Sequence, residues 1–171
     1  MKKAIFLDRD GVINDNKKHV NKPDDLVIYK EAKRGLKKLY DSGYSLFIVT
    51  NQGGVELGHI TDNDLNKIHK KLIEDLKDFC KIKEIKYCPY FNKDASCRKP
   101  NPGMLIELKD KYNIDMSESW MIGDMETDIQ AGKEVKCKTA KIGKVSDLAD
   151  INGDNLEEVA DKILELDANK A

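Results

Sequence analysis

Residues 4–14 read AIFLDRDGVIN, and this stretch decides the fold class. Its first four residues, Ala4 to Leu7, form a short apolar run that is typical of a strand buried on both faces. The run stops at Asp8, a second carboxylate follows at Asp10, and Gly11 comes next. Two acids at the end of a buried strand cost free energy unless they have a partner or a chemical role.

Similar apolar runs alternate with amphipathic segments along the rest of the chain. We predict strands at 45–50, 85–88, 120–124 and 137–142, and helices at 31–41, 62–79, 155–166 and from Pro102 onward. Residues 14–27 and 89–102 are predicted as loops. Strands that alternate with helices predict an α/β fold with a mostly parallel sheet of about five strands, in a single domain over residues 1–171.

Several residues are expected to set the ends and faces of these helices. Thr61 and Asp64 resemble a capping box, and Asp154 is the predicted cap of the last helix. Three residues of helix 31–41 are expected on one core-facing side: Leu36, Leu39 and Tyr40. In helix 62–79 the expected apolar stripe is Leu65, Ile68, Leu72, Leu76 and Phe79.

The overall charge is balanced, with 30 basic and 31 acidic residues and a net charge of −1. This balance argues against long-range attraction to nucleic acid. The apolar run after Met1 is too short for a signal peptide or a membrane span, so we expect a cytoplasmic protein without a membrane partner. The four cysteines, Cys80, Cys88, Cys97 and Cys137, do not resemble a disulfide framework.

Polar residues end three of the predicted strands and precede one helix. Because ligands bind at the carboxyl ends of parallel strands, we expect these residues to meet at one edge of the sheet. They are Asp8 and Asp10, then Thr50, Asn51 and Gln52, then Arg98 and Lys99, and finally Asp124 with Asp128.

The residue types at this edge suit phosphoryl transfer. Asp8, Asp10 and Asp124 concentrate negative charge, which is unfavourable unless a cation lies among them, and oxygen ligands favour Mg²⁺. Asp8 can attack phosphorus, and Asp10 can give and take the proton. Thr50 and Lys99 can donate to the phosphoryl oxygens. Each residue alone has an ordinary structural explanation, so the prediction depends on all four elements occurring together.

Four stretches resemble the motifs of the haloacid dehalogenase-like phosphatases: FLDRDGVIN, IVTNQGG, CRKPNPGM and WMIGDMETDIQAG. The similarity extends over roughly residues 4–143. Within the superfamily it is strongest to the D-glycero-D-manno-heptose 1,7-bisphosphate 7-phosphatases and their relatives, the histidinol-phosphate phosphatases. The resemblance implies a Rossmann-like three-layer sandwich with little or no cap domain. It also implies Mg²⁺-dependent removal of the C7 phosphate through an aspartyl-phosphate, in nucleotide-activated heptose biosynthesis for lipopolysaccharide or capsule.

The same resemblance implies roles for single residues. Asp8 would be the nucleophile and Asp10 the acid/base. The metal would be held by the Asp8 and Asp124 side chains and the Asp10 backbone carbonyl, with Asp128 behind them. The phosphoryl group and the rest of the substrate would be bound by Thr50, Asn51, Gln52 and Lys99, with Arg98 reaching a second phosphate.

Two departures from the family pattern concern Cys88–Cys97 and Leu57. The two cysteines match the outer pair of a zinc loop, but Tyr90 and Ala95 stand where its other ligands would be. Two ligands are too few for structural zinc, so we expect no zinc and free loop thiols rather than a disulfide. Leu57 stands where relatives commonly carry an arginine, which leaves the exact substrate open.

Other residues carry weaker expectations. His19, His59 and His69 show no ligand spacing, and His69 is expected either to pack at the edge of a helical apolar stripe or to face solvent. For Arg9, an ion pair at the edge of the site and a substrate contact are equally open.

Alternative activities are histidinol-phosphate phosphatase, polynucleotide 3′-phosphatase and a phospho-Asp signalling module that does not hydrolyse. The balanced charge and the 6% aromatic content disfavour a nucleic-acid substrate. Asp10 disfavours the signalling module, because an acid/base beside the nucleophile promotes loss of the phosphate. We expect a monomer that acts on a small phosphorylated sugar.

Overall fold

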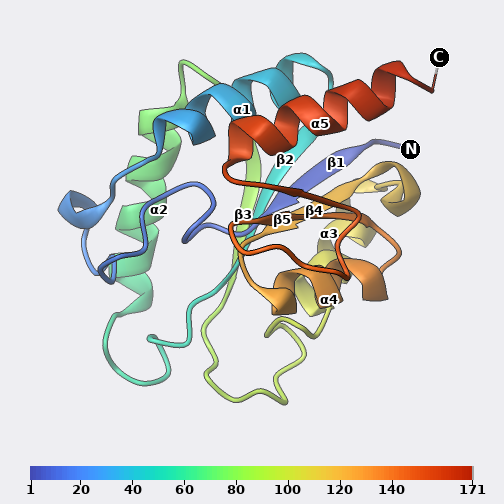
Figure 1. The fold of residues 1–171 in the computed structure, drawn as a ribbon. Helices are drawn as coiled ribbons and strands as arrows, with labels where there is room; N and C mark the ends of the chain where they lie inside the picture. The colour runs from blue at the N-terminus through green and yellow to red at the C-terminus, as the bar shows by residue number, and fades with distance from the viewer. Residues whose placement is uncertain (171) are drawn as a thin grey trace.

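The computed structural model describes residues 1–170, and its centre is one open sheet of six parallel strands (Figure 1). The strands are β1 (Ala4–Leu7), β2 (Ser45–Asn51), β3 (Ile82–Cys88), β4 (Trp120–Gly123), β5 (Lys138–Ile142) and β6 (Ile151–Gly153). Their spatial order is β3-β2-β1-β4-β5-β6. Leu7 at the end of β1 lies beside Ile48 of β2 and Ile122 of β4. The carboxyl ends of these three strands therefore meet at one place.

Helices cover both faces of the sheet and make three layers (Figure 1). They are α1 (Lys30–Asp41), α2 (Asp62–Leu76), α3 (Gly103–Tyr112), α4 (Glu126–Glu134) and α5 (Leu156–Ala168), with short 3-10 turns η1 (Pro23–Asp25) and η2 (Met116–Glu118). Ile5 and Leu7 of β1 point to the core under α1, α2 and α5, whereas Ala4 and Phe6 point to the core under α3 and α4. A strand with two buried faces is continuously apolar, which explains the run at residues 4–7. The predicted Rossmann-like α/β fold is confirmed.

The prediction of about five strands was one too few. The sixth strand, β6, has only three residues, and Ile151 is its one large apolar side chain. The third strand begins at Ile82 rather than at 85, because lysine and glutamate residues interrupt its apolar pattern. Helix α2 ends at Leu76, three residues earlier than predicted.

The predicted helix ends and faces were partly right. The capping box at α2 is confirmed: Thr61 Oγ1 accepts from the Asp64 N–H at 3.0 Å, and Asp64 Oδ2 accepts from the Thr61 N–H at 3.1 Å. The predicted cap of the last helix was wrong, because Asn155 caps α5 by accepting from the Glu158 N–H at 2.9 Å. Tyr40 was wrongly placed in the core, since it is 41% exposed.

Residues 14–27 connect β1 to α1 and pass beside the carboxyl edge of the sheet (Figure 1). Backbone bonds pin this connection where it leaves and rejoins the fold: the Gly11 N–H donates to the Asn14 carbonyl at 2.8 Å, and the Tyr29 N–H donates to the Ile13 carbonyl at 3.0 Å. Within residues 1–170, no helix has both the length and the apolar character that a membrane crossing requires.

Candidate active site

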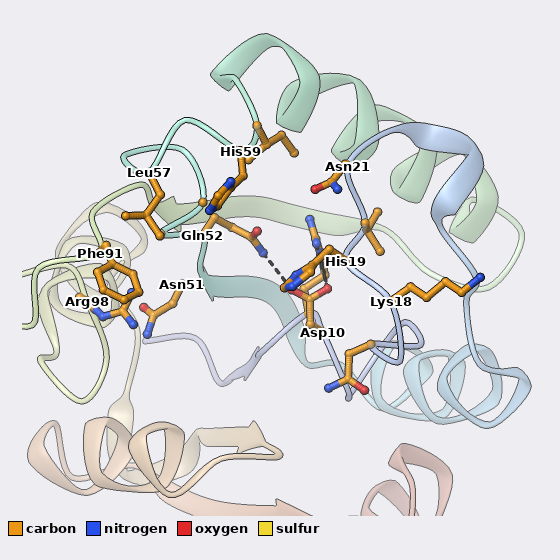
Figure 2. Close-up of a pocket in the computed structure, with 16 residues that line it drawn as sticks. Asp10, Lys18, His19, Asn21, Asn51, Gln52, Leu57, His59, Phe91 and Arg98 are labelled. Atoms are coloured by element: carbon orange, nitrogen blue, oxygen red, sulfur yellow. Dashed lines mark hydrogen bonds and ion pairs between the residues drawn. The ribbon is translucent and has the colours of Figure 1, made fainter.

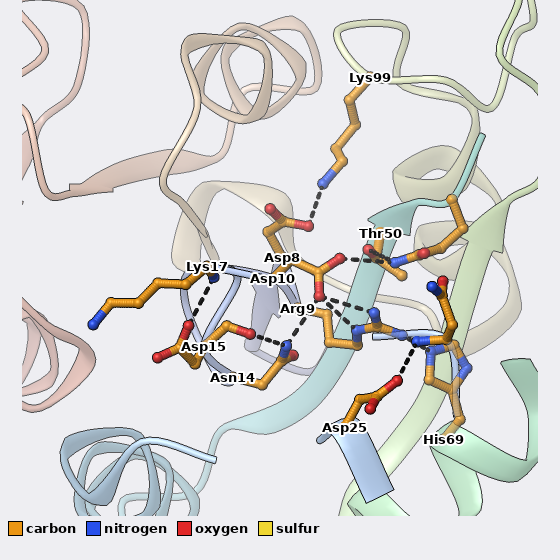
Figure 3. Close-up of polar contacts among 12 residues, drawn as sticks. Asp8, Arg9, Asp10, Asn14, Asp15, Lys17, Asp25, Thr50, His69 and Lys99 are labelled. Atoms are coloured by element: carbon orange, nitrogen blue, oxygen red, sulfur yellow. Dashed lines mark hydrogen bonds and ion pairs between the residues drawn. The ribbon is translucent and has the colours of Figure 1, made fainter. Parts of the chain in front are cut away.

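Lys99 connects Asp8, which follows β1, with strand β2 and with the first turn of α4. It comes from the loop between β3 and α3, is only 4% exposed, and extends its side chain toward Asp8 (Figure 3). Its Nζ lies 3.1 Å from Asp8 Oδ1 and 2.6 Å from Asp128 Oδ1, and it donates to the Val49 carbonyl at 2.7 Å. Burial alone would lower the pKa of Lys99, but the Asp128 and Asp8 carboxylates raise it above its usual range. Lys99 is therefore a buried, fixed positive charge.

Three carboxylates gather around this lysine. Asp8, Asp124 and Asp128 each place an oxygen within 4.8 Å of the others. Burial, followed by the charges of Asp8 and Asp128, raises the pKa of Asp124 to about 7. Burial and the Asp8 charge likewise raise the pKa of Asp128 to about 6, although Lys99 opposes the rise. Lys99 alone does not balance so much negative charge, which indicates a place for a further cation.

Asp124 is the carboxylate best placed to bind that cation. Its Oδ1 is buried and has no hydrogen-bond partner within residues 1–170. Gly11, at a φ of +81°, keeps the space beside it open, because a Cβ there would overlap Asp124 Oδ2. Buried oxygen donors with free lone pairs fit Mg²⁺.

Asp128 has a different position, behind the other two acids. Its Oδ1 faces Lys99, and its Oδ2 accepts from the Met125 N–H at 3.1 Å. Both oxygens therefore already have partners, and the side chain is nearly fully buried. This geometry suits a residue that orients Lys99 more than one that binds a ligand directly.

Asp10 lies beside this cluster and opens on a cavity. Gln52 Nε2 donates to Asp10 Oδ2 at 3.1 Å and to Thr50 Oγ1 at 2.9 Å, and so links the ends of β1 and β2. Burial would raise the pKa of Asp10, but the Arg9 charge and hydrogen bonds from Asn14, Arg9 and Gln52 hold it below its usual range.

Asn51 has a positioning contact with the Lys99 backbone. Its Oδ1 accepts from the Lys99 N–H at 3.0 Å, and its Nδ2 donates to the Lys99 carbonyl at 3.2 Å. The amide thus fixes the loop that delivers Lys99, while the residue also lines the cavity. A direct phosphate contact by Asn51 stays a prediction.

The cavity above Asp10 has a volume of about 760 Å³ (Figure 2). Arg98 lies at one end, where it donates to the Tyr90 carbonyl at 3.1 Å and its guanidinium lies 5.3 Å from the Phe91 ring centre. Lys18, His19 and His59 also line the cavity. Lys18, His19 and His59 were not predicted to line a cavity, because their loops have no periodicity, and the polar character of residues 14–27 hinted only at Lys18 and His19.

The expectation of free thiols in the loop before Lys99 was wrong. Cys88 and Cys97 form a disulfide, with their Cα atoms 5.4 Å apart, a normal separation for such a bond. The loop folds back so that its start at the end of β3 lies beside its end, and sequence spacing alone did not reveal this. In this state neither sulfur is available as a thiolate ligand.

Comparison with known proteins gives the site its context. A model of the haloacid dehalogenase-like hydrolases matches residues 3–142. The chain belongs to this family. A curated relative from Photorhabdus laumondii, a D-glycero-alpha-D-manno-heptose-1,7-bisphosphate 7-phosphatase, is 36% identical over 82% of this chain and 84% of its own length. A Pasteurella multocida relative, named for the beta anomer, is also 36% identical, over 84% of this chain and 83% of its own length.

A solved structure of a similar phosphatase has the same fold. A D,D-heptose 1,7-bisphosphate phosphatase from B. bronchiseptica, complexed with magnesium and phosphate, superposes with a TM-score of 0.86. The alignment covers 96% of this chain and 99% of that one, with 28% sequence identity. Together with the family match and the named relatives, this makes the chain a phosphoric monoester hydrolase.

Proposed function

We propose that this chain removes the C7 phosphate of D-glycero-D-manno-heptose 1,7-bisphosphate, in the synthesis of nucleotide-activated heptose. The arrangement of Asp8, Asp10 and Lys99 supports the phosphatase chemistry, and the names of the relatives support the heptose bisphosphate as its substrate. Asp8 Oδ1 lies 3.1 Å from the buried Nζ of Lys99, and Asp10 lines the cavity beside them. Relatives at the same identity are named for alpha and beta anomers, so the proposal extends to neither anomer in particular.

The chemistry has two steps. A carboxylate oxygen of Asp8 attacks phosphorus, the bond from phosphorus to the C7 oxygen breaks, and Asp10 gives its proton to that oxygen. Water then attacks the phosphorus of the aspartyl-phosphate, Asp10 takes a proton from it, and the bond to Asp8 breaks to release inorganic phosphate. Lys99 and the Thr50 hydroxyl donate to the phosphoryl oxygens as their charge shifts.

A Mg²⁺ ion would be held by the side chains of Asp8 and Asp124 and the backbone carbonyl of Asp10, with Asp128 behind them. When bound, it supplies positive charge that offsets the repulsion between carboxylates and phosphate. The orphaned Asp124 oxygen and the space kept by Gly11 support this assignment.

The second phosphate of a bisphosphate would meet several basic side chains in the cavity. Arg98 lines it from one loop, and Lys18 with His19 lines it from residues 14–27. Asp10 is the only acidic residue among the lining residues in the described part of the chain. A cavity with this charge supports a small substrate that carries phosphate at both ends. The proposal includes that the protein is a cytoplasmic monomer that binds neither nucleic acid nor membrane.

A substrate panel tests the proposal. Phosphate release with Mg²⁺ is measured from the α- and β-heptose 1,7-bisphosphates, heptose 7-phosphate, histidinol phosphate and a 3′-phosphorylated oligonucleotide. We expect the heptose bisphosphates to react fastest and the product to keep its phosphate at C1. Much faster hydrolysis of histidinol phosphate would contradict the proposal and indicate a histidinol-phosphate phosphatase.

A matched pair of substrates tests the second phosphate. Arg98→Met should raise the KM for heptose 1,7-bisphosphate by roughly tenfold or more, through the loss of a charge-assisted contact. The same variant should change the KM for heptose 7-phosphate little, because that substrate lacks the C1 phosphate. An equal rise for both substrates would contradict the assignment of Arg98.

A further inference from the structure

Arg9 is a buried charge that the two chemical steps above do not use. It lies between the nucleophile and the acid/base in sequence, and it is only 1% exposed. Its Nε and Nη2 donate to Asp10 Oδ1 at 3.2 and 2.8 Å, and its Nη1 lies 3.0 Å from Nε2 of His69 (Figure 3). A buried guanidinium is costly unless its donors are satisfied, so these contacts specify its position.

The contacts of Arg9 make the two oxygens of Asp10 unequal. Oδ1 accepts two N–H groups from Arg9 and a third from Asn14 Nδ2 at 3.0 Å. Within residues 1–170, Oδ2 accepts from Gln52 alone, and Gln52 itself lines the cavity. A carboxylate oxygen with three donors around it has little room for a proton, whereas Oδ2 keeps a free lone pair.

His69 completes the arrangement from a different part of the fold. It belongs to α2, is 6% exposed, and packs with its ring centre 6.0 Å from that of Tyr87. Because arginine has only donors, the Nε2 that faces Arg9 must be an unprotonated acceptor, which leaves the proton on Nδ1. A neutral imidazole therefore orients the guanidinium from the side opposite to Asp10.

We propose that Arg9 and His69 are a pair of positioning residues that turn the Asp10 carboxylate so that Oδ2 alone exchanges the proton with the leaving oxygen and then with water. This inference rests on the proposed function, because it concerns the acid/base of that reaction. It goes beyond the proposed function by giving Arg9 a defined task and by assigning His69, sixty positions away, to the same task.

A comparison of two leaving groups separates positioning from a purely structural role. An alkyl phosphate such as a sugar phosphate needs a proton on its leaving oxygen, whereas p-nitrophenyl phosphate expels a stable phenolate without one. Rapid mixing measures the rate at which Asp8 becomes phosphorylated from each substrate. The variants are Arg9→Lys, which keeps the charge but lacks the planar fork, and His69→Leu, which removes the acceptor.

We expect both variants to lower the phosphorylation rate with the alkyl phosphate by roughly 10- to 100-fold, a part of the usual contribution of acid–base catalysis. The KM should change less than about threefold, and the rate with p-nitrophenyl phosphate should stay within about threefold of the unmodified enzyme. His69→Gln, which restores an acceptor oxygen, should recover most of the loss. Tyr87→Phe is the matched control, since it changes the packing partner of His69 without altering the contacts of Arg9, and it should leave both rates unchanged.

If the unmodified enzyme hydrolyses both substrates, then equal losses of phosphorylation rate in the variants with both substrates, or no loss with either, would overturn the inference. An unmodified enzyme that hydrolyses neither substrate would instead overturn the proposed function, and the inference with it. The ¹⁵N spectrum of the imidazoles gives a readout that does not depend on turnover. At pH 7 we expect the Nδ1–H tautomer of His69, and an Nε2–H tautomer would contradict the contact with Arg9.

Discussion

The buried position of His69 predicts a specific loss of stability in mild acid. Burial and then the Arg9 charge lower the pKa of His69 from 6.5 to about 4, against a smaller opposing effect of Asp10. The unfolded chain binds a proton at this histidine near pH 6.5, whereas the folded chain does not bind it until about pH 4. Because the unfolded state binds more protons in this interval, the free energy of unfolding falls as the pH falls from 6.5 toward 4.

The size of the effect follows from the two pKa values. Linkage gives a loss of about 2 kcal/mol at pH 5 and about 3 kcal/mol when the pH falls below 4, relative to pH 8. For a protein of this size, about 2 kcal/mol corresponds to a fall in Tm of roughly 4–8 °C. His69 is almost completely buried, so solvent screening reduces this effect little.

Urea unfolding of the metal-free protein at pH 7 and pH 5 measures the effect, with His69→Gln as the variant that cannot titrate. The raised pKa values of Asp124 and Asp128 act in the opposite direction, but they are present in both proteins and cancel in the difference. We expect the unmodified protein to lose about 2 kcal/mol more than His69→Gln between the two pH values. His59→Gln, at an exposed histidine, serves as the control and should behave like the unmodified protein. Equal pH dependence in the unmodified protein and His69→Gln would refute the reasoning.

Three further predictions concern the metal, the nucleophile and the disulfide. Since the pKa of Asp124 is about 7 and the proton competes with the ion, calorimetry should find Mg²⁺ binding roughly tenfold weaker at pH 6 than at pH 8; unchanged affinity would contradict the assignment of Asp124. Asp8→Asn should lower kcat by roughly 10³-fold or more with an unchanged circular dichroism spectrum, and retained turnover would exclude Asp8 as the nucleophile. Cys97→Ser removes the disulfide to Cys88 and should lower the free energy of unfolding by roughly 2–3 kcal/mol in urea melts. Identical melts of this variant and the oxidised unmodified protein would indicate that the bond is absent in solution.

The sequence predicts the sheet well because most of its strands are buried on both faces. The runs at 4–7, 45–50 and 120–124 stand out as continuous apolar segments, and the structure places strands there. β6 escaped because a three-residue edge strand with one large apolar side chain has no pattern to detect. Tyr40 shows the same limit on helices, since periodicity identifies a face but not how far the core extends across it.

The candidate active-site cluster could be predicted from the sequence for a topological reason. Asp8, Thr50 and Asp124 end neighbouring parallel strands, so their convergence follows once the sheet is predicted. The contact between Arg9 and His69 could not be predicted, because it joins the segment after β1 to helix α2, sixty positions away, through the exact placement of two side chains.

Loops behave differently again. The Cys88–Cys97 bond and the cavity residues His19 and His59 depend on loop conformations that no periodic pattern encodes. For these residues the sequence shows which chemical groups are present, but not how far they lie from one another in the folded protein.

The central place of β1 has a consequence for the growing chain on the ribosome. β1 is made first, and β2 can pair with one of its edges early, but its other edge waits for β4 at residues 120–123. Until then an apolar strand keeps an open edge, which is a template for wrong pairing with other chains. Asp8 and Asp10, which follow β1, have no Lys99 beside them until residue 99 has been made, and Asp124 is made later still. We therefore expect nascent chains that stop before β4 to depend on chaperones, and the phosphatase site to become complete only when most of the protein has been made.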